Sequence, residues 1–369
     1  MPDPLTTAFA SVSPRTARLI LATTAIAIVV CVGISVSPMQ STNLNPDMDR
    51  PGDVDLYQAV IDRVHVGEAY YTALGDELRT RGYPTASVFN WRTPLPLWLI
   101  AKMPHPLVGK VVLGVLALLV LLGAFELVSR EGGIRRGQLC GVVLVGALMP
   151  VALKNLYVMP TLWAGVLIAL SLVAYGLGKR PAGIACAMFA WLCRDLAGLY
   201  CLTLLAMSLW QRRWKEALIW VGCIAIYAAF FAIHTLHFTA MTGPGDVGHA
   251  EGWLQFGGLP FIISIAQMNA FLLVLPQWVT AICLPLCVLG LASWNTVAGR
   301  LIAMVVFAYL AAFMAVGQMF NQYWGSLLAP ALSFGIAFAP AAVRELWAAS
   351  GWRLAALPHF RRRRILAER

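Results

Sequence analysis

The sequence predicts an all-α, polytopic membrane protein with about ten transmembrane helices. Of its 369 residues, 60% are hydrophobic and only 12% are charged, whereas soluble proteins are about 25% charged. The apolar residues form long unbroken runs instead of alternating with polar ones, which excludes an outer-membrane β-barrel. The same composition excludes soluble enzyme folds, nucleic-acid-binding modules and disordered scaffolds, so no nucleic-acid partner is expected.

The apolar runs define the expected spans, because a helix needs about 20 apolar residues to cross a bilayer. The first run follows Arg15 and Arg18 and is long enough to be retained as a membrane helix. The predicted spans are 16–38, 107–128, 137–153, 159–177, 181–193, 196–210, 217–236, 276–294, 299–316 and 323–342.

The basic residues set the direction of these spans, since Lys and Arg collect on the cytoplasmic side of a membrane. With both termini inside, the cytoplasmic segments hold 18 of the 27 Lys and Arg residues but only 6 of the 17 acids. This distribution predicts that both termini are cytoplasmic, and we expect the protein in the inner (cell) membrane of a bacterium. The basic tail 343–369 is then expected to lie beside anionic lipid headgroups.

The whole chain, 1–369, is expected to form one integral membrane domain with two outer segments, 39–93 and 237–273. Within the second, 258–273 is apolar enough to span, but a span there would place the Arg-rich tail outside. We therefore expect an interfacial helix at 258–273.

The outer loop 39–93 is the one extramembrane segment large enough to build a site. Apolar spacing after Asp53 predicts an amphipathic helix lying on the membrane, and a second helix is expected from Tyr70 to Thr80. Asp53 and Asp55 could merely cap the first helix and favour its first turn. Capping does not explain why Asp47 and Asp49 crowd beside them.

Two turns between short spans are predicted to be recessed below the outer surface. The run from Pro181 to Cys193 is too short to cross, which places Arg194 and Asp195 at membrane depth. The turn around Lys154 is also expected to be recessed, although the helices beside it are less clearly too short. Charges at that depth are tolerated beside a wet cavity or a partner, so Arg194 and Asp195 either line a polar chamber or neutralise each other.

Four short motifs resemble those of the GT-C glycosyltransferases. The frame Asp53-Val-Asp55-Leu-Tyr57, with Gly-Glu-Ala-Tyr-Tyr at 67–71, is similar to their first outer loop, and Cys193-Arg194-Asp195-Leu196 to their basic turn. Asn321-Gln322-Tyr323-Trp324, running into Leu-Leu-Ala-Pro at 327–330, resembles the start of their closing span. The WWDYG-type motif of oligosaccharyltransferases is absent.

The resemblance implies transfer of a sugar from a polyprenyl-phosphate donor to a lipid, glycan or protein acceptor at the outer face, with inversion. Such chemistry needs a carboxylate base and cations at the leaving phosphate. Asp53 is our first choice of base and Asp55 the second; the resemblance leaves a divalent cation (Mg²⁺ or Mn²⁺) open and assigns no metal ligand. Arg194 is favoured for the phosphate, and the remaining substrate-binding candidates are Lys154, Arg92, Tyr323, Tyr57 and Gln322.

Two other readings compete with an enzyme. A transporter or flippase of lipid-linked sugars would use Arg194, Asp195 and Lys154 to line a path, but it would more often show repeated halves, and none is visible. A non-catalytic assembly subunit would leave the loop acids replaceable. The tyrosines and arginines of the outer loop could equally anchor lipid headgroups.

Overall fold

A computed structural model describes residues 7–37, 52–248 and 255–352. This part of the chain is helical and contains no β-strand, which confirms the all-α prediction. Asp47, Asp49 and the Arg-rich tail from Arg361 lie outside the described residues.

A helix occupies each of the ten ranges predicted to span. Five of them are long and apolar enough to cross a bilayer, or six if the bent pair at the C-terminal end is one span. Four more are apolar but have only 10–17 residues, so the number of crossings stays a prediction. The helices are α1 Pro14–Ser35, α5 Leu107–Gly132, α6 Ile134–Leu148, α7 Pro160–Gly176, α8 Arg180–Cys193, α9 Gly198–Trp210, α10 Trp214–Met241, α13 Gln277–Ser293, α14 Val297–Ala315 and α15 Ala329–Ser350.

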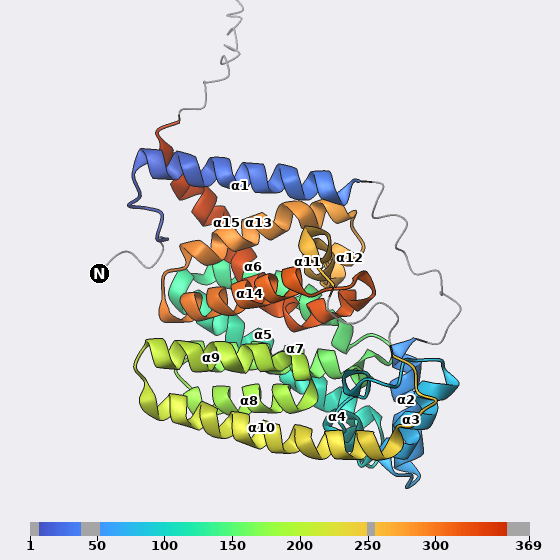
Figure 1. The fold of residues 1–369 in the computed structure, drawn as a ribbon. Helices are drawn as coiled ribbons and strands as arrows, with labels where there is room; N and C mark the ends of the chain where they lie inside the picture. Colours follow the sequence, from blue (N-terminus) through green and yellow to red (C-terminus); the bar gives the residue numbers. More distant parts are fainter. Residues whose placement is uncertain (1–6, 38–51, 249–254, 353–369) are drawn as a thin grey trace, which may run out of the picture.

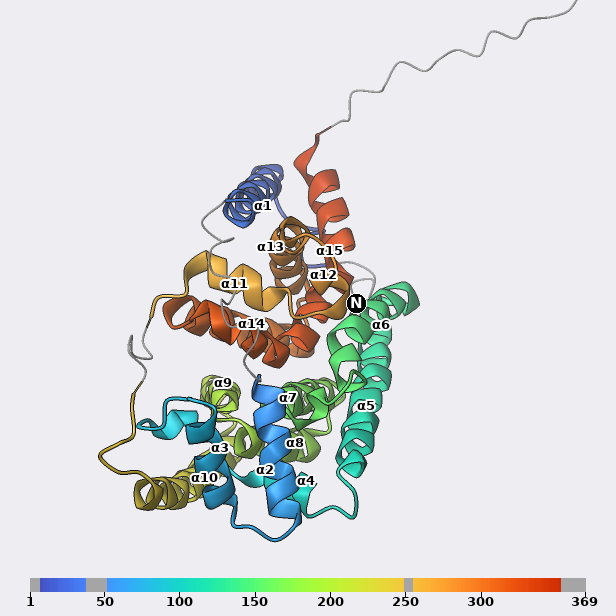
Figure 2. The ribbon, with the colours of Figure 1, turned by 90° about the vertical axis from the view of Figure 1, so that its right-hand side faces the viewer.

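The long helices lie side by side, and the helices of the outer loop gather at one end of the bundle (Figures 1 and 2). α13 packs on α15, α7 on α8, and α1 covers α13 and α15 from outside. Close approach depends on small residues, as is typical of membrane helices. A Cβ atom at Gly290 of α13 would lie 1.9 Å from the carbonyl oxygen of Gly335 in α15, so only glycine fits there.

The outer loop folds into α2 (Asp53–His65), α3 (Tyr70–Thr80), a 3-10 turn η2 (Val88–Asn90) and α4 (Leu95–Ala101). Both predicted loop helices are confirmed. The apolar face of α2 packs against α4 and the 3-10 turn η4 (Leu156–Val158) and is buried there, so protein covers it. α4 was not predicted, because its short apolar run carries no helical period of its own.

The predicted span 323–342 begins later than expected. Residues Met319–Leu327 form a separate 3-10 segment, η6, bent by 70° from α15. Asn321 leaves helical geometry, and Pro330 starts the new helix in its first turn. η6 lies directly on α7, because a Cβ atom at Gly165 would come within 2.1 Å of the Ser326 carbonyl oxygen. Tyr323 thereby lies beside Arg92, at the end of the bundle that carries α2 and α3.

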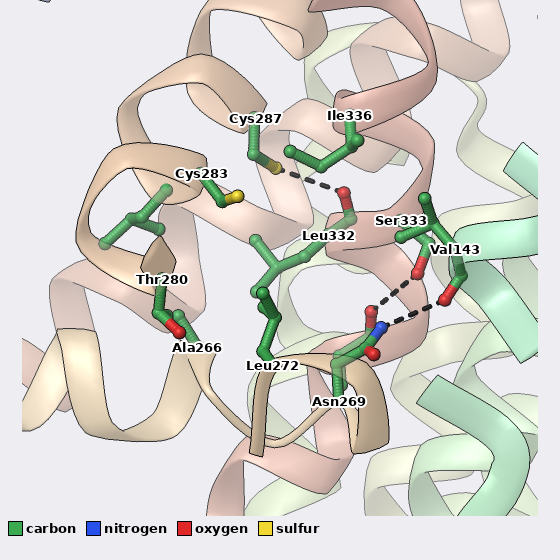
Figure 3. A pocket seen from close by; sticks show the side chains of 12 residues that line it. Val143, Ala266, Asn269, Leu272, Thr280, Cys283, Cys287, Leu332, Ser333 and Ile336 are labelled. Carbon is green, nitrogen blue, oxygen red and sulfur yellow. Dashed lines mark hydrogen bonds between the residues drawn. The ribbon is translucent and has the colours of Figure 1, made fainter. Parts of the chain in front are cut away.

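The expected single helix at 258–273 is broken into α11 (Gly258–Ala266) and α12 (Ala270–Leu273). At the break, the Asn269 side chain accepts a hydrogen bond from Phe271 N and donates one to the Val143 carbonyl oxygen in α6. Figure 3 shows Asn269 beside a small apolar cavity of about 30 Å³ between α6, α13 and α15. Because α11 is almost fully buried against α14 and η6, an exposed interfacial helix is not formed there.

Candidate active site

Four parts of the chain meet at the end of the bundle that carries α2 and α3: the first turns of α2, the segment before α4, the turn between α8 and α9, and η6. α8 has 14 residues, about 21 Å as a helix, and its partner α9 has 13, so the predicted pair of short helices is confirmed. The turn between them carries Arg194 and Asp195. Five predicted site residues lie close enough to interact electrostatically, and we call them the outer cluster: Asp53, Tyr57, Arg92, Arg194 and Tyr323.

The carboxylate of Asp53 faces this cluster. The Tyr83 hydroxyl donates a hydrogen bond of 2.9 Å to Asp53 Oδ1. The predicted role of Asp53 as helix cap is wrong, because Gly52 is the N-cap and no side chain caps the helix. Asp55 lies two residues on, roughly 200° around the helix, and is exposed. The structure therefore separates the two acids and brings only Asp53 to the site.

The guanidinium of Arg92 connects three parts of the site. Its Nε donates to the Tyr57 hydroxyl at 2.9 Å, and its Nη2 donates to the Tyr323 hydroxyl at 3.3 Å. Its Nη1 donates to the Phe89 carbonyl oxygen, and its own carbonyl oxygen accepts a hydrogen bond from Tyr70. Because backbone and side chain are both fixed, the charge of Arg92 is pre-oriented before any ligand binds.

Arg194 is buried between α8 and α9 and has one ionic partner. Only 4% of its side chain is exposed, and its Nη1 lies 3.2 Å from Asp195 Oδ1. Its buried Nε has no hydrogen-bond partner among the described residues. A buried donor without a partner costs free energy, so this atom is available to a ligand acceptor.

Arg92, Arg194 and Asp195 line one small cavity, together with the rings of Phe89 and Phe231. Its volume is about 10 Å³, room for one water molecule at most. A phosphate group can therefore enter only when the lining side chains move apart. The Thr93 hydroxyl ties this wall to the end of α8 by a hydrogen bond to the Leu192 carbonyl oxygen.

The tyrosines of the site stay protonated at neutral pH. Burial raises the pKa of the Tyr57 phenol well above its usual range, although the charge of Arg92 opposes the shift. Burial and the neighbouring Asp53 carboxylate likewise raise the pKa of Tyr83. Tyr83 can therefore remain the hydrogen-bond donor to Asp53 across the physiological range.

Two predicted residues lie apart from the outer cluster. Lys154 is exposed in the turn between α6 and α7, where its carbonyl oxygen accepts a hydrogen bond from the Lys110 ammonium. Gln322 is half-buried next to Tyr323 in η6. Neither side chain makes a contact that joins it to Arg92 or Arg194 within the described ranges.

A second feature, which sequence patterns did not indicate, is a set of hydrogen bonds between the two outer segments, which we call the latch. The Asp246 carboxylate accepts hydrogen bonds from Arg79, from the Thr85 hydroxyl and from Gly243 N, and these contacts lower its pKa well below the usual range. The Val247 carbonyl oxygen accepts one from Thr85 N. The Arg79 guanidinium lies 5.8 Å from the ring centre of Trp91, so the latch supports the residue next to Arg92.

The charges around the small cavity favour an anion. Two guanidinium groups border it, those of Arg92 and Arg194. In the ranges that the structure describes, no three His, Cys, Asp or Glu side chains come together.

Comparisons with known proteins agree with this architecture. No family model matches the sequence, and no curated protein matches it. In fold, the chain is similar to ArnT from Cupriavidus metallidurans in two crystal structures: the apo state, with a TM-score of 0.50 and 16% identity, and the complex with undecaprenyl phosphate, with a TM-score of 0.51 and 15% identity. The matches cover 87% and 89% of this chain. They cover 58% and 60% of the ArnT chains, so this chain spans less than two thirds of their length. This likeness shows the fold alone: the helices of this chain are arranged as in ArnT, in agreement with the predicted all-α membrane fold.

Proposed function

We propose that this integral membrane protein transfers a sugar from a polyprenyl-phosphate donor to an acceptor hydroxyl at the outer face of the membrane. The carrying observation is the outer cluster: one carboxylate and two arginines, drawn from separate parts of the chain, meet at one end of an ArnT-like fold. One ArnT structure holds undecaprenyl phosphate, which supports a lipid phosphate as the ligand class.

In this proposal Asp53 is the general base. It takes the proton of the acceptor hydroxyl while the acceptor oxygen bonds to the anomeric carbon and the carbon–phosphate oxygen bond breaks. The configuration at the anomeric carbon is inverted, and the polyprenyl phosphate leaves with the bonding electron pair. The hydrogen bond from Tyr83 holds the carboxylate in place.

Arg194 and Arg92 stabilise the charge that develops on the leaving phosphate. Arg194 offers a buried donor without a protein partner, and Arg92 is fixed by Tyr57 and Tyr323. A fixed cation in a poorly hydrated place stabilises a transition state more than one in water, because no reorganisation is needed during the reaction.

The test is turnover in liposomes that contain the purified protein and a panel of polyprenyl-phosphate sugars. Acceptor-dependent release of polyprenyl phosphate is the expected result. Movement of intact donor between leaflets, without loss of its sugar, would instead establish the flippase. If no donor of the panel lost its sugar and none moved between the leaflets, both the transferase and the flippase would be contradicted.

A further inference from the structure

A large cavity lies at the other end of the bundle from the outer cluster. It has a volume of about 380 Å³ and is bordered by the last turn of α9, the end of α13 and the first half of α14. These helix ends lie on the left in Figure 1, whereas α2 and α3 lie on the right. The cavity therefore belongs to a part of the molecule that the proposed transfer does not use.

The residues that line this cavity are mostly apolar. Leu291 is buried in its wall, Met304 and Phe307 are exposed along it, and Trp210 is 82% exposed beside it. Arg300 is the charged residue of the lining, and it is exposed. A volume of several hundred Å³ with apolar walls and a few polar groups is typical of ligand sites.

A second, smaller cavity adjoins the first. It has a volume of about 30 Å³, shares Met207 and Gln211 with its larger neighbour, and is bordered by Arg180 and Arg213. The Glu216 carboxylate lies 2.9 Å from the Arg213 guanidinium and also accepts a hydrogen bond from Tyr175. The charges of Arg213 and Glu216 therefore balance each other.

The pair of cavities therefore carries an excess of positive charge. Arg180 and Arg300 are both exposed, and neither forms an ion pair with any residue that the structure describes. Both belong to the segments that the distribution of basic residues places on the cytoplasmic side. An apolar cavity that opens onto unpaired arginines at this level matches a lipid with an anionic headgroup.

We propose that these two cavities bind an anionic phospholipid of the cytoplasmic leaflet. One acyl chain fills the larger cavity, and the phosphate lies against Arg300 and Arg180 at the mouth. The lipid is distinct from the proposed donor, whose phosphate is bound at the opposite ends of α9 and α14. The proposal is independent of the proposed reaction, because no residue of the outer cluster takes part.

Native mass spectrometry of the detergent-purified protein tests this, with dioleoylphosphatidylglycerol as the anionic probe and dioleoylphosphatidylcholine as the neutral one. The wild type is expected to prefer the anionic lipid. The double variant Arg180→Ala, Arg300→Ala should bind it about tenfold more weakly, since charge-assisted contacts are lost. The matched control Arg135→Ala, Arg344→Ala removes two exposed arginines of the same predicted side and should bind like wild type.

A second variant tests the acyl chain separately from the charges. Ala292 is exposed and lines the larger cavity, so Ala292→Trp fills it without removing an arginine. It should weaken binding of the anionic probe while the protein still elutes as one monodisperse species. Equal binding of both probes, an equal loss in the control pair, or unchanged binding in Ala292→Trp would each overturn the proposal. The proposal would also be overturned if equimolar polyprenyl phosphate displaced the anionic probe from the wild type but not from Arg300→Ala, because the cavity would then bind the lipid of the donor class.

Discussion

Arg92 and Tyr323 are 231 residues apart in the chain, yet the guanidinium of Arg92 donates a hydrogen bond of 3.3 Å to the Tyr323 hydroxyl. The contact joins the outer loop to the bent segment that precedes α15. Residues from the outer loop and from η6 thus complete one site.

Removal of that hydroxyl should have a limited effect. Tyr323→Phe leaves Arg92 bound to Tyr57 and to the Phe89 carbonyl oxygen, so we expect a loss in kcat/KM of up to about tenfold, the worth of one hydrogen bond. Gln322→Ala, next in the chain, is the control and should stay near wild type. A larger loss in the control than in Tyr323→Phe would remove Tyr323 from the site.

Arg194→Ala should mainly weaken donor binding or turnover. A charge-assisted contact is worth about 1.5–3 kcal/mol, so the expected loss in kcat/KM is about tenfold to a hundredfold. The alternative, a purely structural pair with Asp195, predicts that Arg194→Ala lowers stability and that the double variant Arg194→Ala, Asp195→Ala regains both stability and activity. Transfer rates and thermal unfolding midpoints of the three proteins, measured together, separate the two accounts.

The latch of Asp246 should depend on pH. Its pKa is lowered in the folded protein, so its contribution is full above the usual Asp range near pH 4 and is lost as the pH falls through the lower folded value. Amide hydrogen exchange of residues 83–91 should be slower in wild type than in Asp246→Asn at neutral pH, and the difference should shrink in acid. A constant difference down to pH 2 would mean that the carboxylate charge is not what holds the latch.

Orientation in the membrane can be tested with an impermeant thiol reagent on intact cells. A cysteine at exposed Thr72 in α3 should react from outside, whereas one at exposed Lys215 at the start of α10 should not. The described native cysteines are all buried or half-buried, which keeps the background low. Labelling of Lys215→Cys from outside would invert the topology and would place the proposed phospholipid site on the wrong leaflet.

Much of the fold could be predicted from local signals. Apolar runs located every long helix, and the helical spacing of Leu56, Val60 and Ile61 located α2, because each signal lies within the element itself. α11 was misjudged because its apolar composition fits both a lipid surface and a protein core. Only the packing against α14 and η6 decides between them.

The sequence allowed most residues of the site to be predicted, but not which of them contact each other. Resemblance pointed to Asp53, Arg194 and Tyr323, and the basic character of the outer loop to Arg92; the structure brings these four together. Which of two nearby acids faces the site depends on the rotation of α2 and on Tyr83, thirty residues later in the chain. The latch of Asp246 could not be predicted, since its partners Arg79 and Thr85 are more than 160 residues away.

The most direct measurement of the central claim is sugar transfer by Asp53→Asn at saturating donor, beside the matched variant Asp55→Asn. The amide oxygen of Asn can still accept the Tyr83 hydrogen bond, so Asp53→Asn should fold and elute as one species. It cannot take the acceptor proton, and general-base contributions are about a hundredfold to ten-thousandfold, so its rate should fall by that factor. Asp55→Asn, on the exposed side of α2, should stay within a few-fold of wild type. If Asp53→Asn and the double variant each kept more than about half of the wild-type rate, Asp53 would not be the base and the account of this site as a transferase would be contradicted.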